Sequence, residues 1–396
     1  MNDSDPERRA STPPPMSSLD GPFEQWIRAG ALDQPPNPGL LASVGDYGIE
    51  RPLDKGASAF VFLAVRLGGH GRVAIKMLRP EHASHPESVE QFIRSATISR
   101  DRLDHPHIVP VLDLNDRPEG PYIVMPYYEQ GSLAEHIRDG QPLPSGKILA
   151  VAADIAAALH HIHANGLIHH DVKPGNVLLD HSGRASLADF GLARTLFNDP
   201  ILDKDAHGAG TAPYVSPRVA NGEAEDTRGD IYSFGAVLYH MLTGRPPYKG
   251  QNSNDIRAKI RAGPPSRAAG INPKAPTGLT AICEGAMARK LCDRYASMED
   301  VIEDLRRVSQ GDQPIGPRGH GSADRRGRLV VGSFVVAALV AGVCWGFWPR
   351  PEGLLHVGHV APLGGDHAWA GAQLGDWNGD MQADLCTIAS KTPVVY

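Results

Sequence analysis

The chain has 396 residues, which is too long for one ordinary domain and allows two or three. A hydrophobic share of 41% and a charged share of 21% are typical of a folded protein. The net charge of −6 argues against a dedicated nucleic-acid-binding protein, since such proteins are usually basic. Four scattered cysteines form neither a disulfide framework nor a zinc-binding pattern, so neither device is expected.

Residues 1–46 are predicted to form a mostly disordered, proline-rich N-terminal tail. They contain eight prolines and little apolar periodicity, so they cannot bury enough surface to offset the entropy of ordering. A short helix is expected around Phe23–Ala31. The segment contains no long apolar stretch, so a secretory signal is not expected.

Residues 47–308 are predicted to fold into a two-lobed α+β body. Short runs rich in β-branched residues come first and indicate strands at 61–65, 73–78, 108–112 and 122–125. Helical patterns follow, notably the alanine-rich run Ile148–Ala164 and the run Ile231–Thr243. Strands followed by helices favour a small β-rich lobe at the N-terminal side and a larger helical lobe after it.

Residues 309–328 form a Gly/Pro-rich juxtamembrane linker that leads to twenty uncharged residues at 329–348. As a helix these twenty would span roughly 30 Å, the hydrocarbon thickness of a bilayer. Three arginines precede them and two tryptophans lie at their far end, which predicts a single transmembrane helix with a cytoplasmic N-terminal side. We therefore expect the cell (inner) membrane, with residues 349–396 outside it. A buried core helix is the alternative.

Several residues in the body are suited to phosphate chemistry. Lys76 ends the sequence Val73-Ala74-Ile75-Lys76 in the predicted strand 73–78, where a lysine can hold a phosphate as a point charge. Asp171 and Asn176 lie in one loop, and Asp189 begins the triplet Asp-Phe-Gly. An aspartate and an asparagine can chelate Mg²⁺, and a second aspartate can accept the proton of an attacking hydroxyl. Charge neutralisation and an oriented nucleophile are what phosphoryl transfer requires.

In this order and spacing, the segments resemble the protein kinase family, particularly bacterial eukaryotic-like Ser/Thr kinases, over about residues 47–308. The resemblance implies transfer of the γ-phosphoryl group of ATP, with Mg²⁺, to protein Ser/Thr hydroxyls in signal transduction. It implies Asp171 as the catalytic base, Lys173 as the residue that stabilises the transferring phosphoryl group, and Asn176 and Asp189 as metal ligands. The ATP-binding residues that it implies are Leu53, Gly56, Val61, Ala74, Lys76, Met125, Pro126 and Tyr128.

The resemblance assigns four further positions. Asp230 matches the aspartate that braces the catalytic-loop backbone, and His169 matches the structural histidine behind that loop. Thr211 favours Ser/Thr over Tyr specificity, as Lys173 does. Arg294 matches a large-lobe arginine that forms a structural ion pair. The many histidines near this loop make a metal site conceivable from their number, but packing and surface positions are the favoured interpretation.

The chain departs from the family at supporting positions. Only the middle one of three expected glycines, Gly56, is present in the phosphate-covering loop, which we expect to stiffen the loop and weaken ATP binding. Ser95 stands near the place of the glutamate that pairs with the strand lysine. His170 replaces an arginine that clamps an activation-loop phosphate, and no Ser, Thr or Tyr occurs between Leu196 and Gly210. We therefore expect no phosphorylation switch within that stretch.

Arg218 stands where the family has the glutamate that pairs with the arginine matched by Arg294, so this ion pair is not expected to form as usual. Three interpretations stay open. The chain is an active sensor kinase, or a catalytically impaired pseudokinase that acts as a membrane scaffold or receptor, or the segment outside the membrane is its functional part, as a Ca²⁺-dependent adhesive module. Protein substrates with Ser/Thr and the membrane are the expected partners. Nucleic acid is not, and a homodimer is left open.

The C-terminal segment carries a candidate calcium loop. Asp376, Asn378, Asp380 and Asp384 offer oxygen ligands at a spacing that lets a tight loop wrap Ca²⁺. An ordinary polar turn is the alternative. Residues 349–396 resemble one partial FG-GAP/VCBS repeat of a β-propeller. Because one repeat cannot close a propeller, we expect either a truncated form of a longer receptor or an orphan repeat.

Overall fold

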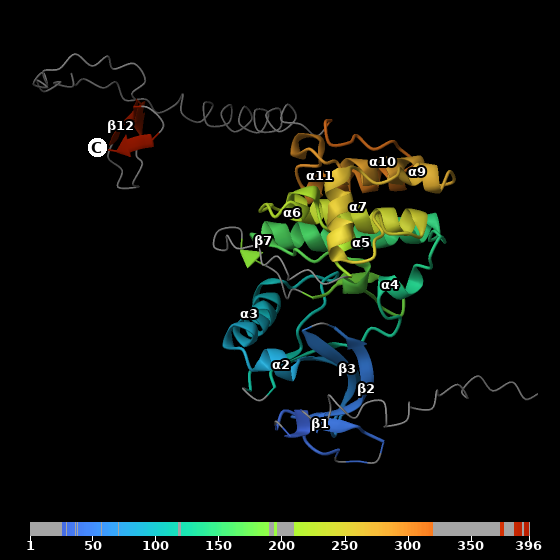
Figure 1. Ribbon diagram of the computed structural model, residues 1–396, viewed down its shortest axis with the longest axis vertical. Coiled ribbons are helices and arrows are strands. Elements are labelled where there is room, and N and C mark those ends of the chain that lie inside the picture. Colours follow the sequence, from blue (N-terminus) through green and yellow to red (C-terminus); the bar gives the residue numbers. More distant parts are fainter. Residues whose placement is uncertain are drawn as a thin grey trace, which may run out of the picture. The chain divides into compact units, whose positions relative to one another are not determined.

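The computed structural model describes residues 26–319, apart from 29, 36, 38, 57, 70, 118–119, 190–193 and 196–209, and three short strands between residues 373 and 395. The chain divides into two compact units, Met1–Arg328 and Leu329–Tyr396. In the first unit a strand-rich lobe is followed by a helical lobe (Figure 1). The predicted two-lobed α+β body is therefore confirmed.

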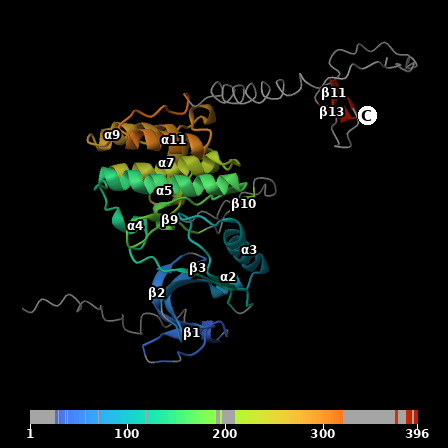
Figure 2. The same cartoon turned by 180° about the vertical axis from the view of Figure 1, so that it is seen from behind.

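The small lobe is built on a six-stranded antiparallel sheet in the order β1-β2-β3-β4-β6-β5. Its strands are β1 (Ala42–Val44), β2 (Tyr47–Lys55), β3 (Ala59–Arg66), β4 (Arg72–Leu78), β5 (Asp113–Asn115) and β6 (Tyr122–Pro126). Aromatic and β-branched residues, which pack well on a pleated surface, are frequent in β3 and β6. The helices α2 (Pro80–Ala83) and α3 (Pro86–Arg102) follow β4 (Figure 2).

The run at 108–112, which we predicted as a strand, forms only one isolated bridge, between Ile108 and Leu187. That prediction was wrong, whereas the runs at 61–65, 73–78 and 122–125 lie within strands. Ile108 belongs to the apolar core of the large lobe. A short apolar run can serve packing as well as a strand, so periodicity alone did not separate the two.

The described residues before β2 belong to the small lobe, which corrects the predicted tail through residue 46. Trp26 is only 1% exposed and packs edge-to-face on Phe60 and Phe62, with ring centroids 5.0 and 5.6 Å apart. Leu32 is buried in the same cluster, and the backbone of Asp33 pairs with β1. A few large apolar side chains secure this segment, and they leave no periodic pattern in the sequence.

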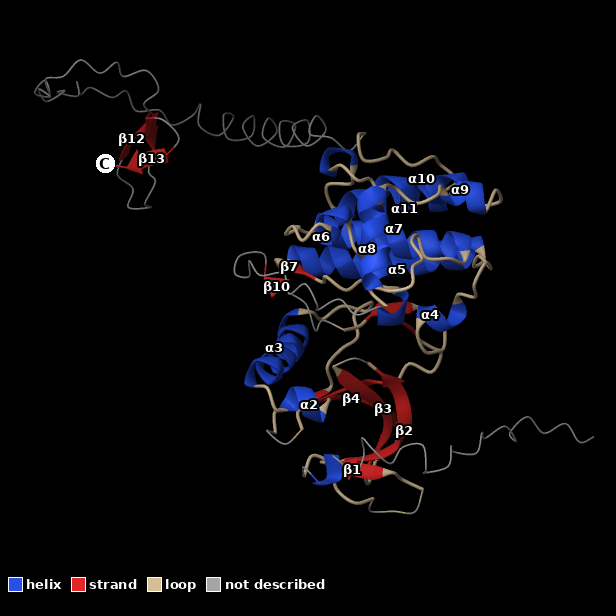
Figure 3. Ribbon diagram, in the orientation of Figure 1, coloured by secondary structure: helices blue, strands red, loops and turns tan. Residues whose placement is uncertain are grey.

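The large lobe is mainly helical (Figure 3), and most of its buried apolar side chains belong to one cluster. Its longer helices are α5 (Ser145–Ala164), α7 (Arg228–Thr243), α8 (Ser253–Ala262), α10 (Thr277–Ala286) and α11 (Met298–Ser309). Its shorter ones are α4 (Leu133–His136), α6 (Pro217–Ala220) and α9 (Ala268–Ile271). Helix α7 is buried along most of its length and ends at Gly244, whose φ of 67° suits a glycine. A helix buried on most sides makes a rigid support for the loops that pack on it.

The folded body extends beyond residue 308, the boundary that we predicted. Asp304, on α11, accepts the backbone N–H groups of Ile315 at 2.7 Å and of Gly316 at 2.8 Å. The same buried carboxylate accepts the Tyr295 hydroxyl at 2.6 Å. The start of the predicted linker is therefore fastened to the large lobe by hydrogen bonds to a buried carboxylate.

The predicted membrane span at 329–348 lies outside the described residues. Of the helices that the structure does describe, none is both long and apolar enough to cross a bilayer. The second unit contains an antiparallel sheet of β11 (Gln373–Gly375), β12 (Asp384–Ala389) and β13 (Thr392–Val395). Pairing of Gly375 with Asp384 brings together the two ends of the segment that carries the predicted calcium ligands.

Candidate active site

The predicted catalytic loop, residues 169–176, follows β7 (Leu167–Ile168), which pairs with β10 (Arg194–Thr195). The loop ends in a 3₁₀ turn, Pro174–Asn176, directly before the hairpin of β8 (Val177–Leu179) and β9 (Ala185–Leu187). Because antiparallel strands reverse direction, Asn176 before β8 and Asp189 after β9 lie at the same end of the hairpin. The Ala188 N–H accordingly donates to the Asn176 carbonyl at 2.8 Å.

Asp171 is the centre of a hydrogen-bonded cluster. Its Oδ2 accepts from Lys173 Nζ at 2.8 Å and from Asn176 Nδ2 at 2.9 Å. Its Oδ1 accepts from the Thr211 hydroxyl at 2.9 Å, and Lys173 Nζ donates to the same Thr211 oxygen at 3.0 Å. Both carboxylate oxygens are therefore held in a fixed direction by side chains that the sequence had singled out.

A buried carboxylate at the start of α7 holds the backbone of this loop. Asp230 accepts the N–H groups of His169 at 2.8 Å and His170 at 2.9 Å, and it lies 2.8 Å from the Nε2 atom of His163. Burial alone would raise the pKa of Asp230, but the hydrogen bond and charge of His163 and the other two histidines lower it to about 2. Sequence reasoning placed Asp230 in this role and missed His163, which lies on α5 and gives no local signal.

The two histidines before Asp171 shape the loop in different ways. His169 Nδ1 accepts the Asp171 N–H at 3.2 Å, and its Nε2 lies 3.1 Å from the Ala188 carbonyl, so a neutral ring with the proton on Nε2 satisfies both contacts. Burial lowers the pKa of His169, which favours that neutral form. His170 has a φ of 65°, a left-handed conformation that non-glycine residues adopt only where the surroundings fix it.

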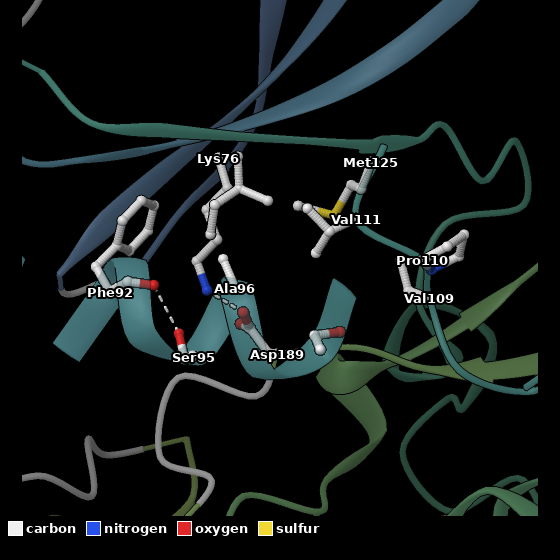
Figure 4. Close-up of a pocket in the computed structure, with 11 residues that line it drawn as sticks. Lys76, Phe92, Ser95, Ala96, Val109, Pro110, Val111, Met125 and Asp189 are labelled. Carbon is white, nitrogen blue, oxygen red and sulfur yellow. Dashed lines mark hydrogen bonds and ion pairs between the residues drawn. The ribbon is translucent and has the colours of Figure 1, made fainter. Parts of the chain in front are cut away.

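Lys76 of β4 and Asp189 form an ion pair between Nζ and Oδ1 (Figure 4). Burial alone would raise the pKa of Asp189, but the Lys76 ammonium holds it below its usual value. Asp189 also adopts a left-handed φ of 70°. The predicted phosphate-binding lysine and the predicted metal ligand therefore contact each other.

Helix α3 presents no acid to Lys76, in agreement with the sequence. Ser95 and Ala96 line the pocket around Lys76, together with Phe92 and Met125 (Figure 4). The Ser95 hydroxyl donates to the Phe92 carbonyl within its own helix at 2.8 Å, and Glu90 is exposed. Among the described residues, the acid that pairs with Lys76 is thus Asp189 and not a residue of α3.

Four predicted nucleotide-binding residues share one face of the small-lobe sheet. In the ladder Val61 lies opposite Lys76, and Ala74 lies opposite Met125. Opposite residues, and residues two apart in one strand, point to the same face. The other predicted contacts are Leu53 at a register shift in β2, Gly56 in the following loop, Pro126 at the end of β6, and Tyr128 two residues later.

The loop that follows β2 is held by Arg79, which sequence reasoning missed. Arg79 Nε donates to the Gly56 carbonyl at 2.9 Å, and the Arg79 N–H donates to the Ser58 carbonyl at 2.9 Å. A Cβ atom at Gly56 would lie 2.9 Å from the Ala59 carbonyl oxygen. The one glycine that remains in this loop is therefore at a position where the backbone passes too close for a side chain.

As expected, Arg294 does not pair with residue 218, but it forms an ion pair with another acid that the sequence did not reveal. Arg294 is fully buried, and its Nη1 donates to Glu225 Oε1, a carboxylate that is only 2% exposed. Ser216 donates to the other oxygen of Glu225. Arg218, at the position where the glutamate was expected, turns instead to Glu223 at 3.4 Å. The acid that pairs with Arg294 lies seven positions after residue 218, where the family has its glutamate. A residue-by-residue comparison with the family pattern therefore could not find it.

The calcium prediction and the activation stretch fall largely outside the described residues. Asp376, Asn378, Asp380 and the stretch 196–209 are not described, and Asp384 is described only as the first residue of β12. Within the described ranges, no three or more His, Cys, Asp and Glu side chains are grouped so that they could hold a metal ion.

Comparison with known proteins bears on the first unit. The family described as "Protein kinase domain" matches residues 47–297. The chain is 36% identical over 270 residues to "Serine/threonine-protein kinase PrkC" of Bacillus subtilis (strain 168), which covers 68% of this chain and 41% of that protein. It is 35% identical over 278 residues to "Serine/threonine-protein kinase PknB" of Mycobacterium leprae (strain TN), covering 68% and 44%. For PknB of Mycobacterium tuberculosis (strain ATCC 25618 / H37Rv) it is 33% over 288 residues, covering 72% and 46%. The chain spans less than half the length of these relatives.

Proposed function

Because this chain belongs to the protein kinase family, we propose that it transfers the γ-phosphoryl group of ATP to Ser and Thr hydroxyls of proteins. The observation that carries the proposal is the cluster around Asp171, whose two carboxylate oxygens are held by Lys173, Asn176 and Thr211. The relatives with this domain are named serine/threonine-protein kinases, which supports the same substrate class.

Each residue of the cluster has a chemical task. Asp171 orients the substrate hydroxyl and accepts its proton while the oxygen bonds to the γ-phosphorus and the bond from that phosphorus to the ADP oxygen breaks. Lys173, which lies beside Asp171, stabilises the negative charge on the transferring group. Thr211 holds both side chains in register, because it donates to one and accepts from the other.

The metal-binding positions fit Mg²⁺ by their chemistry. Asn176 Nδ2 is directed at Asp171, which leaves the amide oxygen as a ligand, and Asp189 offers a carboxylate; both are hard oxygen donors. Bound Mg²⁺ would neutralise phosphate charge there. Lys76, which pairs with Asp189 in this structure, would supply a positive charge to the α- and β-phosphates.

The proposal is tested by phosphate transfer from γ-labelled ATP to a generic protein substrate, with the full chain. Asp171→Asn should lower the rate by about 10²-fold or more, since general base catalysis contributes about 10²–10⁴-fold. Asp101→Asn is the matched control, because Asp101 lies near the end of α3, is exposed and pairs with the neighbouring Arg100. Label should appear on Ser and Thr and not on Tyr. The absence of transfer at saturating Mg·ATP would rule the activity out.

A second candidate is a pseudokinase that serves as a membrane scaffold or receptor. The observation that favours it is Ser95, which stands where the family has an acid on helix α3, so that no acid of this helix pairs with Lys76. Lys76 pairs instead with Asp189, a predicted metal ligand. This candidate predicts no phosphate transfer. It also predicts little rise in melting temperature with Mg·ATP. Transfer that depends on Asp171 would eliminate it.

We further propose that residues 329–348 anchor the chain in the cell membrane in a single pass, with the first unit in the cytoplasm and a role in signal transduction. Twenty uncharged residues that follow three arginines and carry two tryptophans at their far end support this proposal. In a membrane fraction, protease added from the outside should remove residues 349–396 and leave the first unit intact. Release of the full chain by alkaline carbonate would exclude a spanning helix.

Two smaller proposals concern binding. A Ca²⁺ ion held by Asp376, Asn378, Asp380 and Asp384 is supported by the ligand spacing and by the β11–β12 pairing that brings the ends of this segment together. Calcium titration of the full chain, with Asp380→Asn as the variant, tests it. A homodimer is the second proposal, and sedimentation of the full chain across a range of concentrations tests that.

A further inference from the structure

The outer face of the small-lobe sheet, opposite the face of Lys76, is covered by the chain's own N-terminal segment. Phe60 and Phe62 alternate with Val61 on β3, so their rings point away from the nucleotide side. Trp26 packs against both rings at interplanar angles of 79° and 78°. The indole therefore packs on β3, the strand that leads out of the phosphate-covering loop.

Phe60 also contacts the residue that holds that loop. The Arg79 guanidinium carbon lies 4.3 Å from the centroid of the Phe60 ring, within the range of a cation–π interaction. From this position Arg79 Nε reaches the Gly56 carbonyl, and the Arg79 N–H reaches the Ser58 carbonyl. Three contacts thus run in sequence: Trp26 on Phe60, Phe60 on Arg79, and Arg79 on the loop.

We infer that Arg79 and Trp26 are positioning residues for the phosphate-covering loop, so that the segment around Trp26 sets the affinity for Mg·ATP. A loop with three glycines samples many conformations, whereas this loop has one glycine and is clamped at two carbonyl groups. When the clamp holds the binding-competent form, its loss lowers the fraction of competent loop and raises the apparent Kd by the same factor. The inference rests on the proposed function, since it concerns ATP binding at that site.

The test measures the Kd of Mg·ATP by calorimetry with the full chain, and the KM for ATP and for a protein substrate in the transfer assay. Arg79→Ala and Trp26→Ala are the variants. Trp26→Phe is the conservative one, since a phenyl ring can keep the edge-to-face contact. Arg72→Ala is the matched control, because Arg72 begins β4, the strand that Arg79 directly follows, is 60% exposed and pairs with Glu50 away from the loop.

Arg79→Ala should raise the Kd and the KM for ATP about tenfold, the effect of losing one hydrogen bond from a charged donor. Trp26→Ala should act in the same direction, and Trp26→Phe should recover most of the affinity. The KM for the protein substrate should stay unchanged, and so should every value for Arg72→Ala. If Trp26→Ala does not fold, Arg79→Ala and Trp26→Phe still decide the question.

The inference is overturned if Arg79→Ala keeps the unaltered Kd and KM for ATP while only its melting temperature or kcat falls, because a merely structural role would do that. If the unaltered chain binds no Mg·ATP, the proposed function and this inference both fail. If it binds, and Arg79→Ala binds equally well, only this inference fails.

Discussion

The ion pair of Arg294 with Glu225 allows the sharpest test of whether Glu225 stabilises the fold in place of the acid that is absent at position 218. In Glu225→Ala the guanidinium stays fully buried and keeps only two backbone acceptors, the Ala288 carbonyl at 2.9 Å and the Arg228 carbonyl at 2.8 Å. Removing one partner of a buried pair typically costs about 3–5 kcal/mol, because a buried charge is left uncompensated. The two remaining carbonyls place the expected loss at the lower end, about 3 kcal/mol.

For a folded body of this size, 1 kcal/mol shifts the melting temperature by about 2–4 °C. Glu225→Ala should therefore melt roughly 6–12 °C below the unaltered chain. The matched control is Glu223→Ala, two residues away. Its carboxylate is 47% exposed and lies 3.4 Å from Arg218, so about 0–1 kcal/mol should be lost. Calorimetry and urea unfolding of the full chain measure both variants.

The double variant Glu225→Ala/Arg294→Met separates the charge from the packing. It removes the buried cation together with its partner, and most of the lost stability should return, since apolar replacement of a buried pair is often neutral. The reasoning is refuted if Glu225→Ala is no less stable than Glu223→Ala. It is also refuted if the double variant is less stable than Glu225→Ala, because the loss would then lie in packing and not in an unpaired charge.

Three further outcomes follow from the structure. Ser95→Glu should return an acid to Lys76 and lower the KM for ATP severalfold, whereas Gln91→Glu on the exposed side of α3 should not; equal effects of the two would contradict the assignment. Burial lowers the pKa of His240 to about 4, below its ordinary value of 6.5. Between these two pH values the unfolded chain binds a proton at His240 and the folded chain does not. Stability should then fall as the pH drops from 6.5 toward 4, and urea midpoints at pH 7 and pH 5 should differ less in His240→Gln. Asp304→Asn should speed hydrogen exchange at the amides of Ile315 and Gly316 by about tenfold, and unchanged protection there would show that the carboxylate does not hold this segment.

Much of the first unit could be predicted from the sequence, because its signals are local. Alternating β-branched residues placed three of the four predicted strands, and alanine-rich helical spacing placed α5. The loop residues Asp171, Lys173 and Asn176 lie within five positions of one another, so short-range spacing was enough to group them. Thr211 was found only through the family pattern, since it reaches Asp171 from forty positions away.

The residues that sequence reasoning missed act across long separations. Glu225 meets Arg294 from 69 positions away, and Trp26 reaches Phe60 from outside the strand pattern. Arg79 follows a predicted strand directly, but nothing in its neighbours shows that its side chain turns back to the loop at Gly56. Such contacts depend on which elements the fold brings together, and a pattern read along the chain does not contain that information.

The buried ion pair of Arg294 and the cluster around Asp171 bear differently on catalysis. Glu225 pairs a buried arginine, and a scaffold needs that pair as much as an enzyme does, so it says nothing about activity. The side chains of Asp171 and Lys173 are 13% and 24% exposed, and in a largely buried ion pair the cost of desolvation offsets much of the attraction, so the pair is weak evidence of a role in stability. Folding alone does not require a lysine, an asparagine and a threonine directed at one carboxylate. The cluster therefore favours phosphoryl transfer over a scaffold, even though Lys76 pairs with Asp189 and not with an acid on helix α3.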